Sequence, residues 1–136
     1  MLDCLFCKII AGEISSHKVY EDENVFAFLD IKPVNPGHVL VIPKRHSATL
    51  LETSDEDLIH VMKAIKKIAA AAMRAVGAEG FNLGVNTGAV ADQVVFHTHF
   101  QIMPRFSGDG RDLWHGEERE DLVQIAEEIR GELLEG

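Results

Sequence analysis

Nine residues at positions 96–104, FHTHFQIMP, constrain the fold of this chain more than any other segment. Side chains alternate between the two faces of a strand, so His97, His99 and Gln101 would share one face. A polar row inside a sheet is costly unless it meets a metal, a ligand or water. We therefore expect either a functional site or a row of side chains that faces solvent. The opposite face would serve packing, and it carries Phe96, Thr98, Phe100 and Ile102.

The rest of the chain predicts one α+β domain over residues 1–136. Apolar residues at helical spacing, preceded by Ser54 as a cap, predict a long helix that ends near Val76. A second amphipathic helix is expected over residues 117–134. The order of elements favours a five-stranded, mostly antiparallel sheet with two main helices. The expected strands are residues 17–22, 24–30, 38–42, 81–86 and 94–103, the last of them closed by Pro104.

Composition limits the partners of this chain. It holds 22 acidic and 13 basic side chains, and so acidic a surface lacks the cations that nucleic-acid binding requires. No run approaches the roughly 18 apolar residues of a membrane span. We expect neither nucleic acid nor membrane as a partner, and a cytoplasmic location. A small anionic substrate stays compatible with a local pocket.

The two cysteines, Cys4 and Cys7, are spaced C-x2-C near the N-terminus. In a reducing compartment this spacing favours a metal site or a redox pair over a structural disulfide. A pair of buried, reduced cysteines is the remaining interpretation.

Several motifs in chain order resemble those of the histidine triad (HIT) family. They are LFCKIIAGEI, YEDENVFAFLDIKPVNPGHVLVIPKRH, FNLGVNTG and QVVFHTHFQIMPR, which together cover nearly the whole chain. The resemblance implies a HIT-like fold and a homodimer whose sheet continues across the interface. It also implies that Trp114 packs at the subunit boundary.

The resemblance gives each triad residue a role. The middle residue of the family motif, here His99, attacks the α-phosphorus of a nucleotide and forms a covalent nucleotidyl-histidine. A neutral imidazole can do this near pH 7, because its unperturbed pKa is about 6.5. The third residue is Gln101 where the family usually has histidine, so it can hydrogen-bond a phosphoryl oxygen but cannot titrate. This form is similar to the nucleotidylyltransferase branch of the family.

Two thiolates and two imidazoles match a closed, tetrahedral zinc site. The resemblance implies a structural zinc ion held by Cys4, Cys7, His46 and His97. The alternative is two buried thiols with an exposed His46.

The resemblance also implies a nucleotide site. Asp30 matches the family residue that holds the ribose hydroxyls. We expect His38, at the start of a strand, to be solvated. The base is expected against Phe6, Ile9, Phe28 and Ile31, and the phosphates near Asn86 and Gln93. The apolar residues among these match the base site of the family and could equally be ordinary core residues.

These matches predict a nucleotide phosphohydrolase or nucleotidyltransferase acting on nucleoside phosphoramidates or dinucleoside polyphosphates. Two residues before the triad depart from the family pattern of Gly-Gln-Ser/Thr, because Asp92 and Val94 replace the glycine and the hydroxyl residue. The competing prediction is therefore a nucleotide-binding or interaction module with little turnover.

Overall fold

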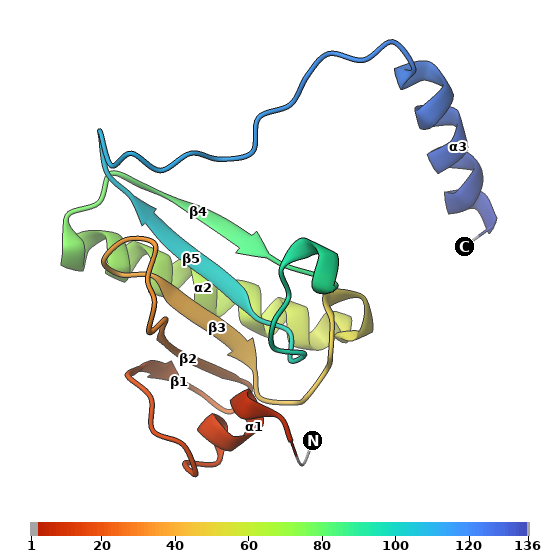
Figure 1. Cartoon of the computed structure of the whole chain (residues 1–136). Coiled ribbons are helices and arrows are strands. Elements are labelled where there is room, and N and C mark those ends of the chain that lie inside the picture. The colour runs from red at the N-terminus through yellow and green to blue at the C-terminus, as the bar shows by residue number, and fades with distance from the viewer. Residues whose placement is uncertain (1–2, 136) are drawn as a thin grey trace.

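The structure of residues 3–135, a computed structural model, is built on one five-stranded antiparallel sheet in the order β1-β2-β3-β5-β4 (Figure 1). The long helix α2 covers one face of the sheet and the short helix α1 lies on the other (Figure 1). No helix in this part of the chain could cross a membrane. The strands are β1 (Lys18–Glu21), β2 (Val25–Leu29), β3 (Val39–Pro43), β4 (Gly80–Val85) and β5 (Phe100–Arg105). The helices are α1 (Leu5–Ile10), α2 (Asp55–Val76) and α3 (Leu122–Glu135), with 3₁₀ turns at Leu50–Glu52 and Ala89–Ala91.

Helix α2 confirms the prediction from its apolar spacing. The Ser54 hydroxyl accepts a hydrogen bond from the backbone N–H of Asp57, which satisfies one of the free donors of the first turn. Gly77 ends the helix in the left-handed conformation with φ 73°, which glycine adopts without steric cost. The buried side of the helix packs on Val25, Ala27, Val39, Val41, Phe100 and Ile102 of the sheet.

A second apolar layer lies between α1 and the opposite face of the sheet. It joins Phe6 and Ile9 of α1 to the strand residues Phe26, Phe28, Leu40 and Ile42. The sequence pattern did not predict α1, which is only six residues long. Its first turn is held by Cys4, whose sulfur accepts from the N–H of Cys7 at 3.3 Å. Packing of two large apolar residues, rather than intrinsic helix propensity, stabilises so short a helix.

The prediction of a strand over residues 94–103 is wrong at both ends. Strand β5 pairs with β3 only from Phe100 to Ile102, so the two triad histidines precede the sheet. At the other end Pro104 lies within the strand instead of closing it. Beyond Ile102 the β3 side of β5 has no partner, so a residue without an N–H is tolerated there. Phe96, expected in the packing face, is 46% exposed.

The C-terminal helix differs from its prediction in both position and packing. It begins at Leu122, five residues later than expected, and none of its residues is buried. Figure 1 shows it at the end of an extended segment that leads away from the sheet. Its apolar side chains Leu122, Ile125, Ile129 and Leu133 are exposed in the single chain.

Candidate active site and metal centre

His99 lies in the segment that enters β5, with its ring held in one tautomer. Its Nδ1 is 2.8 Å from the carbonyl oxygen of His97. A carbonyl can only accept, so Nδ1 carries the proton and Nε2 keeps its lone pair. The ring is 9% exposed and meets Phe6 edge-on, with centroids 5.1 Å apart. His99 thus has the form that a nucleophilic imidazole needs.

Gln101 is oriented by His38, a residue that the sequence pattern assigned to solvent. That prediction is wrong, because His38 is only 2% exposed. Its Nδ1 accepts from the N–H of Val34 at 3.0 Å, so its proton lies on Nε2. Nε2 then donates to Oε1 of Gln101 at 2.9 Å. The Gln101 amide therefore presents its NH₂ group, a donor, to any ligand.

Asp30 follows β2 and lies close to the same histidine. Its Oδ1 accepts from the N–H of Lys32 at 2.8 Å, and its Oδ2 is 3.6 Å from His38 Nε2. The carboxylate is partly exposed and keeps acceptor capacity for a ligand. The structure therefore brings Asp30, His38 and Gln101 together on the triad side of the sheet.

The four residues expected against the base are not equivalent in the structure. Phe6 and Phe28 meet edge-on at 5.4 Å, and Ile9 belongs to the same buried layer. Ile31 lies outside that layer and is 83% exposed. Phe6 of this buried layer contacts the ring of His99, whereas Ile31 faces solvent in the single chain.

Gln93 is buried, and its amide bonds both the loop before the triad and the segment after β3. Its Oε1 accepts from the N–H of Gly88, and its Nε2 donates to the carbonyl oxygens of Ala48 and Val95. Asn86 Nδ2 is 3.4 Å from the carbonyl oxygen of Asp92. Gln93 therefore shapes this loop, while Asn86 lies where the loop meets β4.

Asp92 ends the 3₁₀ turn of this loop in the left-handed region, with φ 68°. This conformation is costly for a residue with a Cβ and free for glycine. We expect Asp92→Gly to raise the free energy of unfolding by about 1 kcal/mol, measured by urea denaturation. Asp112→Gly, in the exposed segment that leads to α3, is the matched control and is expected to leave the free energy of unfolding unchanged. An unchanged or lower stability of Asp92→Gly would contradict the strain argument.

A cavity of about 340 Å³ opens beside Gln101, and neither His97 nor His99 is among its lining residues. Gln101, Gly84 and Asn86 line it from the sheet, and Arg111 and Trp114 line it from the C-terminal segment. Trp114 is 88% exposed in the single chain. The cavity therefore places the free amide of Gln101 where a small ligand can reach it.

Arg105 also lines this cavity but is engaged within the protein. Its Nε and one terminal nitrogen bind the two carboxylate oxygens of Asp109 at 2.8 and 2.9 Å. The Arg105 guanidinium, with the N–H groups of Arg111 and Phe106, holds the pKa of the Asp109 carboxyl well below its usual range. This ion pair holds the start of the segment that leads to α3. The Arg105 side chain therefore stabilises the fold in this structure.

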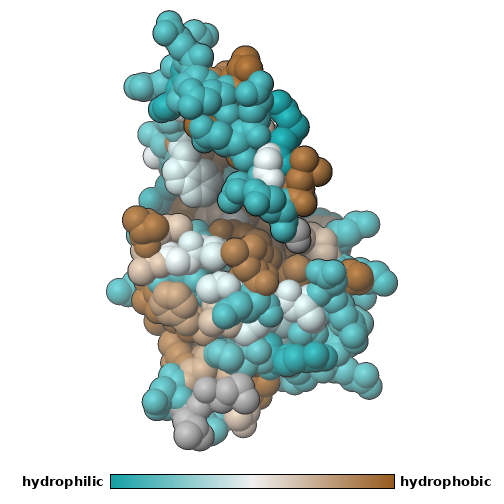
Figure 2. Space-filling model, turned by 90° about the vertical axis from the view of Figure 1, so that its right-hand side faces the viewer, coloured by the Kyte–Doolittle hydropathy of each residue, from teal (hydrophilic) through white to brown (hydrophobic). Residues whose placement is uncertain are grey.

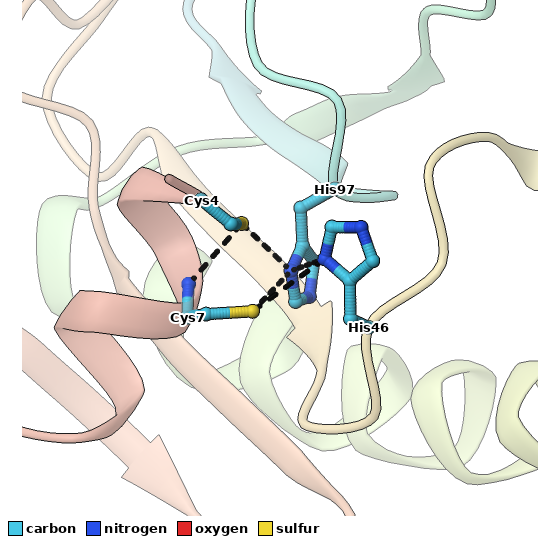
Figure 3. Close-up of side chains that lie close together, drawn as sticks. All are labelled: Cys4, Cys7, His46 and His97. Atoms are coloured by element: carbon cyan, nitrogen blue, oxygen red, sulfur yellow. Dashed lines mark hydrogen bonds between the residues drawn. The ribbon is translucent and has the colours of Figure 1, made fainter. Parts of the chain in front are cut away.

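A second constellation joins residues far apart in the sequence. Cys7 comes from α1 and Cys4 from the cap before it, His46 from the loop after β3, and His97 from the segment before β5 (Figure 3). One ligand atom from each lies within 4.8 Å of all the others. His97 is fully buried, and its Nε2 donates to the Pro43 carbonyl oxygen at 2.8 Å. This bond leaves Nδ1 unprotonated and directed at the sulfurs.

The spacing of these atoms is a test of whether zinc fits. With bonds of about 2.3 Å to sulfur and about 2.05 Å to nitrogen, a tetrahedron separates sulfur from nitrogen by about 3.5 Å and two nitrogens by about 3.3 Å. Three of the four distances from sulfur to nitrogen are 3.4, 3.5 and 3.5 Å, the two Nδ1 atoms are 3.3 Å apart, and every remaining pair lies within 4.8 Å. The four residues therefore fit one zinc ion.

Burial perturbs two members of this cluster. Burial, followed by the hydrogen bond with Cys4, raises the pKa of the Cys7 thiol to about 11. Burial lowers the pKa of His97 to about 4, against the opposing effect of its bond to Pro43. His97 is therefore a neutral imidazole at physiological pH, the form that binds metals.

Comparison with known proteins places the chain in a family. The HIT domain family matches residues 11–108, which include the triad and all five strands of the sheet. The chain belongs to the HIT family. This HIT protein is 46% identical over 129 residues to an uncharacterized HIT-like protein of Methanocaldococcus jannaschii, covering 94% of this chain and 99% of that protein. It is 42% identical over 104 residues to the adenosine 5'-monophosphoramidase of Schizosaccharomyces pombe, covering 76% and 75% of the two chains.

Solved structures agree with this assignment. A crystal structure from Streptococcus mutans matches this HIT protein with a TM-score of 0.92 and 46% identity, covering 98% of this chain and 87% of that one. A zinc-bound histidine triad family protein from Mycobacterium smegmatis matches with a TM-score of 0.78 and 35% identity, covering 97% and 96%. The HIT-like α+β fold with a five-stranded sheet, expected from the sequence, is confirmed.

Proposed function

We propose that this HIT protein is a nucleotide phosphohydrolase or nucleotidyltransferase that acts on nucleoside phosphoramidates or dinucleoside polyphosphates. The observation that carries the proposal is the His99 tautomer, with Nδ1–H donated to the His97 carbonyl oxygen at 2.8 Å and Nε2 left free. The similarity to a monophosphoramidase supports the same class of chemistry.

The reaction would proceed in two displacements at phosphorus. In the first, the Nε2 lone pair of His99 forms a bond to the α-phosphorus while the bond to the leaving group breaks, which gives a nucleotidyl-histidine. In the second, water or another acceptor attacks phosphorus, the P–N bond breaks and the imidazole is restored. The NH₂ group of Gln101 would donate to a phosphoryl oxygen, and Asp30 would accept from the ribose hydroxyls.

The remaining nucleotide contacts involve the base and the phosphates. Phe6, Ile9 and Phe28 would form the buried side of the base site and Ile31 its exposed side. Asn86 would contact the phosphates from the end of β4, and Gln93 would act by holding the loop.

The possible leaving groups differ in whether they need a proton from the site. An amine must be protonated to leave, whereas a nucleotide or polyphosphate departs as a stable anion. Gln101 carries no titratable proton, and Val94 has no hydroxyl to offer. This pair of residues favours dinucleoside polyphosphates over phosphoramidates as substrates.

Intact-protein mass spectrometry after rapid quench tests the proposal. We would mix the protein with adenosine phosphoramidate or a dinucleoside tetraphosphate and expect an added nucleotidyl mass that survives base and is lost in acid. Nucleotide binding with no adduct for any substrate would favour the alternative, a binding module with little turnover. Asp92, Val94 and Gln101 are the residues that motivate that alternative.

We also infer a structural zinc ion held by Cys4, Cys7, His46 and His97. Four protein ligands leave no open coordination position. The ion would therefore link α1 to the triad segment and would not bind the substrate. A cytoplasmic location, where thiols stay reduced, is consistent with this role. A redox pair of Cys4 and Cys7 is the alternative, and stoichiometric zinc in protein purified without added metal would exclude it.

We further propose that the protein is a homodimer that pairs two β4 strands. β4 is an edge of the sheet, and its Phe81 and Leu83 are exposed large apolar residues. Further large apolar residues, including Leu51, Ile59 and Val90, are exposed, and Figure 2 shows hydrophobic patches on the side toward which α3 projects. A continuous sheet would satisfy the free backbone groups of β4.

Light scattering during gel filtration tests this dimer. We expect about twice the monomer mass of 15.1 kDa for the wild type and a monomer for Leu83→Arg. Val19→Arg changes an exposed residue on the opposite edge strand and is the matched control, expected to stay dimeric. A wild-type monomer, or a dimer of Leu83→Arg, would contradict the pairing.

A further inference from the structure

The segment that carries His97 and His99 has no backbone pairing with the sheet. Pairing between β3 and β5 stops at Phe100, and residues 94–99 have no ladder partner. Thr98, between the two histidines, instead donates its backbone N–H to the carbonyl oxygen of Ser47 at 2.8 Å. The backbone of His99 therefore depends on contacts made by the residue next to it.

Thr98 belongs to a cluster of three hydroxyl groups from three parts of the chain. Its Oγ1 is 2.8 Å from Thr53 Oγ1, and Ser47 Oγ is 2.7 Å from the same atom. Thr53 donates its own proton to the carbonyl oxygen of Thr49 at 2.8 Å. The Thr53 oxygen then accepts, and the Thr98 hydroxyl directs its proton at Thr53, 2.8 Å away, because its other acceptor, the Ser47 carbonyl oxygen, is 3.3 Å away. Thr98 and Thr53 are buried, which makes these bonds costly to break.

The cluster ties the triad segment to two neighbouring elements. Ser47 follows the metal-ligand residue His46, and Thr53 precedes Ser54, the cap of α2. On one side of Thr98, His97 is fastened to the metal cluster, and on the other side His99 carries the reactive nitrogen. The Thr98 N–H bond to Ser47 holds the peptide unit between these two histidines, and the Thr98 hydroxyl adds a side-chain bond to the same residue.

We infer that Thr98 is a positioning residue for the nucleophile, acting through its hydroxyl bond to Thr53 to hold the backbone that aims His99. This inference rests on the proposed function. Misplacement of a reacting atom by an ångström is enough to lower a rate by orders of magnitude without loss of binding. The hydroxyl cluster should therefore affect the chemical step more than substrate affinity.

Thr98→Val tests the inference, because valine keeps the shape of threonine and removes the hydroxyl. We expect kcat and the rate of adduct formation to fall by roughly 30-fold, with KM changed less than about threefold. Thr98→Ser keeps the hydroxyl and should restore kcat to within about threefold of wild type. Thr49→Val, which removes a more exposed hydroxyl outside the cluster, is the matched control with expected wild-type kcat.

Hydrogen exchange of peptides spanning residues 94–99 gives a second readout that needs no activity. We expect faster exchange in Thr98→Val than in Thr98→Ser, with the same zinc content in both. Unchanged kcat and unchanged exchange in Thr98→Val, even with a lower Tm, would overturn the inference. An absence of adduct in the wild type would contradict the proposed function instead, and exchange alone would then decide whether the hydroxyl holds this segment.

Discussion

Replacement of His99 by alanine is expected to lower turnover by roughly 10³-fold or more and to abolish the nucleotidyl adduct. The reason is that, in the proposed mechanism, the bond to phosphorus forms at Nε2 of His99, which alanine removes. Turnover of a dinucleoside polyphosphate and intact-protein mass spectrometry after quench measure the two effects. Nucleotide binding should survive, since Asp30 and the apolar layer around Phe6 are unchanged.

A loss of turnover in His99→Ala supports the mechanism only if the variant is still folded. His99 packs edge-on against Phe6, so alanine leaves a small cavity, and His99→Asn provides a variant of closer volume. Both should keep the wild-type zinc content and a cooperative thermal transition. His17→Ala removes an exposed histidine and should leave turnover unchanged. Turnover near the wild-type level in both His99 variants would reject the covalent mechanism.

Among these variants, we expect removal of one proposed zinc ligand to cause the largest loss of stability. Cys7→Ser should lower the free energy of unfolding by about 3 kcal/mol, or roughly 10 °C in Tm, because zinc binding contributes directly to folding and the ligand set links α1 to the rest of the chain. Differential scanning calorimetry with zinc analysis of the same sample measures both consequences.

A chelator provides the control for this variant. It should lower the Tm of the wild type by a similar amount and leave Cys7→Ser nearly unaffected, because the variant has little metal to lose. Reductant alone should change neither protein. A wild type that is purified without zinc and whose Tm responds to reductant would instead support the redox pair of Cys4 and Cys7.

Much of the site could be predicted from local pattern. The period of the apolar residues and the cap at Ser54 located α2, since both act within a few residues of one another. The identities of the cluster residues Cys4, Cys7, His46 and His97 came from family motifs, and the structure brings them together. His99 and Gln101 are proposed as catalytic residues on the same basis, and the structure adds how each is oriented.

Other features depended on segments distant in the chain. Alternation predicts a strand wherever polar and apolar residues alternate, but pairing requires a partner, and β3 supplies none beyond Val41. The same alternation put Thr98 on a packing face, whereas its hydroxyl meets Thr53, 45 residues away. No local signal distinguishes a histidine in solvent from His38, which is buried because β3 and β5 place it against Gln101.

The sequence by itself determined which residue types are available for the proposed chemistry and in what order, because bonding capacity belongs to individual side chains. The start of β5, the tautomers of the histidines and the position of α3 were not determined in this way, because each depends on which atoms from elsewhere in the chain lie within hydrogen-bonding or packing distance. The apolar side chains of α3 repeat at helical spacing whether or not a surface covers them, so periodicity predicted the helix and could not predict its packing.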